Sequence, residues 1–132
     1  MGVVLLDTTF LIDAERGRLD LDEVIADDDD VAIAAVTVAE ILVGVELASE
    51  KHRPRREAFV DDMISSIPVI PYDLSVAAHH AKLLAAVKIG GRPRGAHDLI
   101  IAATARATNR KVITADPEAF GQLPGVDVAA HR

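Results

Sequence analysis

The stretch VVLLDTT, residues Val3 to Thr9, decides how this chain folds. Its first four residues are an uninterrupted aliphatic run, which is typical of a strand buried on both faces. Asp7 follows that run directly, and burying a carboxylate beside a strand is costly unless the carboxylate has polar partners. Asp7 therefore either caps a helix that begins at Thr8 or has a function at the end of the strand, and this stretch leaves both interpretations open.

The same alternation of short apolar runs with amphipathic segments continues along the chain. The expected strands are Val3–Leu6, Val31–Ala34, Val69–Pro71, Lys111–Thr114 and Val126–Ala129. The expected helices are Thr8–Arg16, Leu21–Ala26, Thr37–Ser49, Pro54–Ile67, Leu74–Ile89 and His97–Thr108. Strands separated by helices need right-handed crossovers, which give a mainly parallel sheet covered on both faces. We therefore predict one α/β domain over residues 1–132, with a central sheet of four to five strands flanked by helices.

Composition and charge exclude several classes of protein. Cysteine is absent, which excludes disulfides, thiolate metal sites and a cysteine nucleophile and agrees with a cytoplasmic protein. The net charge of −7 argues against a broad basic surface for nucleic acid, although bound metal ions could still attract a polyanion locally. The apolar segment Val31–Ala48 contains Glu40 and Glu46 and is shorter than the roughly 20 residues of a membrane span. We expect no membrane association.

Four acids occupy comparable places in this predicted fold. Asp7 and Asp116 follow strands, Glu40 lies one turn into the helix after the second strand, and Asp98 opens the helix after a glycine-rich loop. Ligands of parallel α/β sheets bind outside the carboxyl ends of the strands. The four acids are therefore expected to meet at one edge of the sheet.

Each acid also has a structural interpretation that must be weighed. Asp7 and Asp98 could be helix caps, and Asp116 before Pro117 is a common turn arrangement. Glu40 is harder to explain in this way, because it lies within a helix and has no basic residue three or four positions away. The functional interpretation depends on the convergence of all four.

Four carboxylates without cysteine or a spaced histidine pair favour Mg²⁺ or Mn²⁺ over Zn²⁺. One or two such ions would neutralise the mutual repulsion of the acids, generate hydroxide from water and stabilise the attacking and leaving oxygens of a phosphodiester. Phosphodiester hydrolysis is the natural inference. Two alternatives stay open: an aspartyl-phosphate protein, either a phosphatase or a receiver domain, with Asp7 as nucleophile, and a protein-binding module without catalysis. The phosphatase pattern would have an acid two residues after Asp7, where this chain has Thr9.

Four segments together resemble a known family. They are DTTFLID, TVAEILVGV, HDLIIAATA and KVITADPEAF, and in this order and spacing they resemble the PIN-domain ribonucleases, above all the VapC-type toxins of bacterial toxin–antitoxin pairs. The resemblance runs from about Val4 to Val128. It implies a PIN-like three-layer sandwich and cleavage of single-stranded RNA with Mg²⁺ or Mn²⁺.

The resemblance also assigns roles to residues and suggests partners. It matches Asp7, Glu40, Asp98 and Asp116 to the four family acids, as catalytic residues and metal ligands. Thr9 and Thr114 match hydroxyl residues that support the acids, although the family more often has serine or asparagine in the place of Thr9. His97 before the third acid is another small departure. The expected partners are a VapB-type antitoxin and, in a homodimer, a second copy of the chain.

Two arginines lie on the loop that leads to Asp98. Arg92 and Arg94, in the sequence GGRPRG, could contact RNA phosphates, and a solvated loop would explain them equally well.

Overall fold

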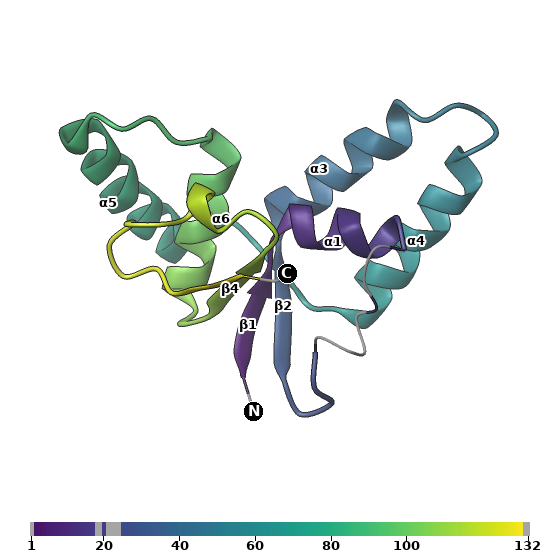
Figure 1. Ribbon diagram of the computed structural model, residues 1–132, viewed down its shortest axis with the longest axis horizontal. Coiled ribbons are helices and arrows are strands. Elements are labelled where there is room, and N and C mark those ends of the chain that lie inside the picture. The colour runs from purple at the N-terminus through teal and green to yellow at the C-terminus, as the bar shows by residue number, and fades with distance from the viewer. Residues whose placement is uncertain (1, 18–19, 21–24, 131–132) are drawn as a thin grey trace.

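The computed structural model describes residues 2–17, 20 and 25–130, and its elements agree with most of the expected ones (Figure 1). The strands are β1 (Val3–Leu6), β2 (Asp30–Ala34), β3 (Val69–Ile70), β4 (Lys111–Thr114) and β5 (Val128–Ala130). The helices are α1 (Thr8–Glu15), α3 (Ala35–Glu46), α4 (Arg53–Ser66), α5 (Leu74–Gly90) and α6 (Ala96–Ala107), with a short 3₁₀ helix η1 (Pro117–Ala119). The helix expected over Leu21–Ala26 lies, apart from its last two residues, outside the described part.

The five strands form one sheet in the order β3-β2-β1-β4-β5, and every neighbouring pair is parallel. The strand of the opening stretch is central: Leu5 pairs with Ala32 of β2 on one side and with Val112 of β4 on the other. All three side chains are fully buried. The predicted parallel sheet of four to five strands is confirmed.

Helices cover both faces of this sheet, because successive side chains of a strand point to opposite sides. Leu5 packs with α5 and α6 in one apolar cluster, whereas Val4 and Leu6 pack with α1 and α4 in another. Figure 1 shows the two groups of helices on either side of the strands. Burial of each such aliphatic side chain contributes about 1.5–3 kcal/mol, so the apolar run from Val3 to Leu6 supports both layers of the sandwich.

Several element boundaries differ from the expected ones by one to three residues. The largest difference is at the end of α3, which is Glu46 instead of Ser49. Helix α3 begins at Ala35, directly after β2, instead of at Thr37. Strand β5 begins at Val128 instead of Val126. The backbone N–H of Val126 donates to the carbonyl of Leu123 (3.2 Å), closing a turn in which Gly125 has a φ of 72°. Val126 therefore belongs to the turn.

The order of the strands fixes where a ligand crevice can form. From β1 the chain proceeds to β2 and β3 on one side, and then crosses to β4 and β5 on the other. The connections after β1 and after β4 therefore leave in opposite directions, which opens a crevice at the carboxyl ends of these two strands. Asp7 follows β1, and Thr114 ends β4.

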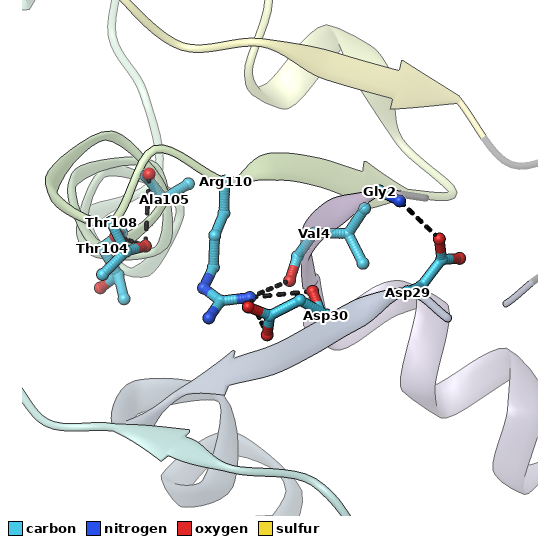
Figure 2. A network of polar contacts seen from close by, with 8 residues as sticks. All are labelled: Gly2, Val4, Asp29, Asp30, Thr104, Ala105, Thr108 and Arg110. Carbon is cyan, nitrogen blue, oxygen red and sulfur yellow. Dashed lines mark hydrogen bonds and ion pairs between the residues drawn. The ribbon is translucent and has the colours of Figure 1, made fainter. Parts of the chain in front are cut away.

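The opposite, amino end of the sheet is closed by an arginine (Figure 2). Arg110 Nη1 donates to the carbonyl of Val4 (3.2 Å), to the carbonyl of Asp30 (2.9 Å) and to Asp30 Oδ1 (3.0 Å). Asp29 Oδ1 accepts a hydrogen bond from the backbone N–H of Gly2 (2.7 Å). Hydrogen bonds from the backbone N–H groups of Ala26 and Gly2 hold the pKa of Asp29 below its ordinary value. Through its own hydrogen bonds, Arg110 joins the beginnings of β1, β2 and β4.

None of the described helices is long and apolar enough to cross a membrane.

Candidate active site

Asp7 is buried, with 2% of its surface exposed, and accepts three hydrogen bonds at the end of β1. Its Oδ1 accepts from the backbone N–H of Thr8 (2.7 Å), so Asp7 is the N-cap of α1. Its Oδ2 accepts from the hydroxyls of Thr9 and Thr114, both at 2.6 Å. The alternatives of cap and functional residue are therefore compatible, because one oxygen caps the helix and the other faces β4.

Thr114 connects Asp7 with the fourth acid. Its hydroxyl donates to Asp7 and accepts from the backbone N–H of Asp116 (2.9 Å). The hydroxyls of Thr9 and Thr114 lie 3.3 Å apart. Asp116 itself is exposed and begins the turn into η1. The structure thus brings Thr9 and Thr114 to the carboxylate that they were expected to support.

Glu40 is held by residues from two other helices. Thr8 Oγ1 donates to Glu40 Oε1 (2.8 Å), and His97 Nδ1 of α6 lies 3.4 Å from Glu40 Oε2. Thr8 Oγ1 also lies 3.2 Å from the hydroxyl of buried Thr37. Sequence reasoning assigned no contact to Thr8 or Thr37. The spacing of Thr37 and Glu40, three residues apart on one helix, was the available signal, because it places both on the same face.

Asp98 lies in the first turn of α6, whose N-cap is Gly95. The carboxylate lies so close to the loop that a Cβ at Gly95 would be 2.8 Å from Asp98 Oδ2. Burial raises the pKa of Asp98, and the charges of Asp7, Glu40 and Asp116 raise it further, in that order, while His97 lowers it. This shift is the clearest sign that the four acids share one electrostatic environment. A pocket open to solvent gives access to these acids, and its lining residues are Glu40, Gly95, Ala96, His97 and Asp98.

The chemistry of these donors fits a hard divalent cation, because carboxylate oxygens are the ligands that Mg²⁺ and Mn²⁺ prefer. The described residues contain no group of three or more acids or histidines already gathered at metal-binding distances. Residues 7, 40, 98 and 116 are all described, so the acids are neighbours rather than a closed cage. Their assignment as metal ligands stays a prediction.

The two loop arginines differ in their surroundings. Arg94 donates from Nη1 to the carbonyl of Ala119 (3.1 Å) and from Nη2 to the carbonyl of Gly121 (2.5 Å). Arg92 is exposed and lies 3.5 Å from Gln122 Oε1. The guanidinium of Arg94 is thus engaged with backbone groups, which fits neither a solvated loop residue nor a side chain free to contact RNA.

The chain is a parallel α/β sandwich with acids at the carboxyl ends of its strands. The model of the PIN domain family matches residues 4–125. The chain therefore belongs to the PIN domain family. It is 34% identical to Ribonuclease VapC5 of Mycobacterium tuberculosis over 92% of this chain and 87% of that protein. It is 27% identical to Ribonuclease VapC of Rickettsia bellii over 97% of this chain and 95% of that protein. Within the PIN domain family, the chain belongs to the VapC ribonucleases.

A solved structure supports the same family. The chain superimposes on the crystal structure of VapBC-5 from Mycobacterium tuberculosis, a member of the VapBC family of toxin–antitoxin systems, with a TM-score of 0.76. The identity is 29%, and the match covers 100% of this chain and 99% of that one. The resemblance to PIN-domain ribonucleases and the PIN-like fold are confirmed.

Proposed function

We propose that this protein is a metal-dependent endoribonuclease and the toxin of a VapBC-type toxin–antitoxin pair. The observation that carries the proposal is the meeting of the four acids at the carboxyl end of the sheet. The Thr114 hydroxyl joins Asp7 to the backbone of Asp116, and Glu40 and Asp98 line one pocket. Burial, and then the charges of the other three acids, raise the pKa of Asp98. Such a concentration of negative charge is unfavourable in the free chain and becomes favourable when a divalent cation binds. Membership of the VapC ribonucleases supports the same activity.

In this proposal Asp7, Glu40, Asp98 and Asp116 hold one or two Mg²⁺ or Mn²⁺ ions. When bound, such ions lower the pKa of water and neutralise charge on a phosphodiester. Hydrolysis forms a bond from the water oxygen to phosphorus and breaks the bond from phosphorus to a ribose oxygen, which leaves with a proton.

The side chains around the acids keep them in place for that chemistry. Thr9 and Thr114 fix the orientation of the Asp7 carboxylate through its Oδ2. Thr8 fixes Glu40 through its Oε1, which leaves Oε2 facing His97. Hydrogen bonds of this kind to a metal-binding carboxylate set its orientation and its basicity.

The proposed partners follow from the relatives. The similar solved structure is a member of a toxin–antitoxin family, which supports a VapB-type antitoxin as the inhibitor of this chain. The names of the relatives support RNA as the substrate. An RNA substrate inside the cell supports a cytoplasmic location. A homodimer stays a prediction.

The experiment is cleavage of a mixed single-stranded RNA pool by the purified protein with Mn²⁺. We expect internal cuts that stop with EDTA and with the Asp7→Asn variant. Cleavage that survives both would contradict the proposal. A stable phosphoryl-protein formed at Asp7 would instead favour a phosphatase or receiver domain. A folded protein that binds a partner without cutting any RNA would favour a binding module.

A further inference from the structure

Arg94 ties the loop before α6 to the segment after β4. Its two terminal nitrogens donate to the carbonyls of Ala119 and Gly121. Ala119 is the last residue of η1, and the last carbonyls of a helix have no partner within it. The Arg94 guanidinium therefore satisfies carbonyls of a backbone segment that begins 25 residues further along the chain, at Ala119.

Each of the two tied segments carries an acid of the candidate site. Arg94 precedes Asp98 by four residues, and Ala119 follows Asp116 by three. The loop is also joined to the helix of the third acid. Gly95 is the N-cap of α6, and its carbonyl accepts a hydrogen bond from the backbone N–H of Leu99 (3.1 Å), the residue after Asp98. A displacement of Arg94, the residue before Gly95, would therefore be transmitted to the first turn of α6, which carries Asp98.

The charge of Arg94 does not explain where it lies. Among the described residues Arg94 has no carboxylate partner, and its Nε is buried without a hydrogen-bond acceptor. Its contacts are to backbone carbonyls, so its effect is on the position of the loop.

We propose that Arg94 is a positioning residue, a clasp that fixes the separation of the segments carrying Asp98 and Asp116 and thereby sets the affinity of the site for a divalent cation. The inference rests on the proposed function in that it takes these acids to be metal ligands. It replaces the hypothesis that Arg94 contacts RNA.

The test compares Arg94→Lys with Arg92→Ala. Lysine keeps the positive charge, but its compact ammonium lacks the planar fork that reaches two carbonyls at once. Arg92 lies on the same loop, is bonded to the side chain of Gln122 and has no backbone partner among the residues that the structure describes, so it serves as the control. Hydrogen exchange in residues 96–99 and 117–121 is measured in metal-free protein, and the Kd for Mn²⁺ is measured by calorimetry. Thermal melts identify any variant that has lost its fold.

We expect Arg94→Lys to speed exchange in both segments and to weaken Mn²⁺ binding about tenfold, while Arg92→Ala changes neither. Unchanged exchange in Arg94→Lys would refute the clasp. A second pattern would also refute it: the Kd for Mn²⁺ is unchanged, while Arg94→Ala raises the KM for RNA in a salt-dependent way and Arg94→Lys restores that KM. Such a pattern defines a contact with RNA phosphate. If the wild-type protein binds no Mn²⁺, the proposed function fails, whereas exchange in the metal-free variants still decides whether Arg94 holds the two segments together.

Discussion

Charged side chains lie at both ends of the parallel sheet, and the two ends differ in whether acids are paired with basic groups. At the amino end, Arg110 lies 3.0 Å from Asp30 Oδ1 and also binds two strand carbonyls. At the carboxyl end, burial and the charges of three other acids raise the pKa of Asp98, and the basic group paired with the acids among the described residues is His97, 3.4 Å from Glu40. The first cluster is balanced within the chain, and the second is not.

This difference separates a structural cluster from a functional one. Arg110 has a side chain only 14% exposed, and its charge is matched by one carboxylate and two carbonyl dipoles. Such a cluster fixes the register of the strands. Uncompensated acids instead oppose folding, and a chain keeps them where an external cation or substrate supplies the missing charge. Equal changes at the two ends should therefore have unequal effects.

The largest effect is expected from removing one carboxylate at each end. Asp7→Asn should lower kcat/KM for RNA cleavage by at least about 100-fold, because it removes a proposed metal ligand. Asp30→Asn makes the same chemical change at the amino end and should leave kcat/KM within about twofold of wild type when assayed well below its Tm. Both are measured with one RNA substrate and Mn²⁺. An active Asp7→Asn enzyme would show that the carboxyl end is not the active site.

The next effect is on stability. Arg110→Ala removes hydrogen bonds to Val4 and Asp30 and should lower the free energy of unfolding by about 2–3 kcal/mol. Urea denaturation at pH 7 measures this difference. RNA cleavage by the folded variant should be unchanged. A variant as stable as wild type would mean that the amino-end cluster does not join the strands energetically.

A smaller effect is expected from the hydroxyl that orients Glu40. Thr8→Val removes the donor to Glu40 Oε1 with little change of volume and should lower kcat/KM about tenfold, which is about 1.4 kcal/mol. Thr8→Ser keeps the hydroxyl and is the control. Equal activity in the valine and serine variants would assign Thr8 to packing alone.

The smallest effect concerns pH. Because the pKa of Asp98 is raised above its ordinary value of 3.8, the folded protein binds more protons than the unfolded chain in the window above that value. The stability of metal-free protein should therefore fall as pH rises through this window. Asp98→Asn removes the effect and should be more stable than wild type at pH 7, by less than about 1 kcal/mol, and no more stable at pH 3. Denaturation curves at both pH values test the sign, and a variant less stable at pH 7 would contradict it.

The sequence was most informative where the signal is local. The aliphatic run from Val3 to Leu6 predicts a buried central strand, and the structure pairs it on both sides. The four acids were located by their positions relative to strands and helices, and the structure places them at one end of the sheet. Their catalytic role stays a prediction. The contact of Thr9 with Asp7 was also accessible, because Thr9 lies two residues after Asp7, in the first turn of the helix that Asp7 caps.

The tertiary structure decided what depends on residues distant in the chain. Glu40 has no basic residue three or four positions away on its own helix, and its contacts to Thr8 and His97 form only when α1, α3 and α6 converge. Arg94 looked like a free basic residue on a loop, and folding brings it to the carbonyls of Ala119 and Gly121. Periodicity and capping are encoded within a few residues, so the sequence by itself determined the elements and the positions of the acids. Hydrogen bonds across elements depend on the packing of helices against the sheet, so only the folded chain decided which side chains hold the acids in place.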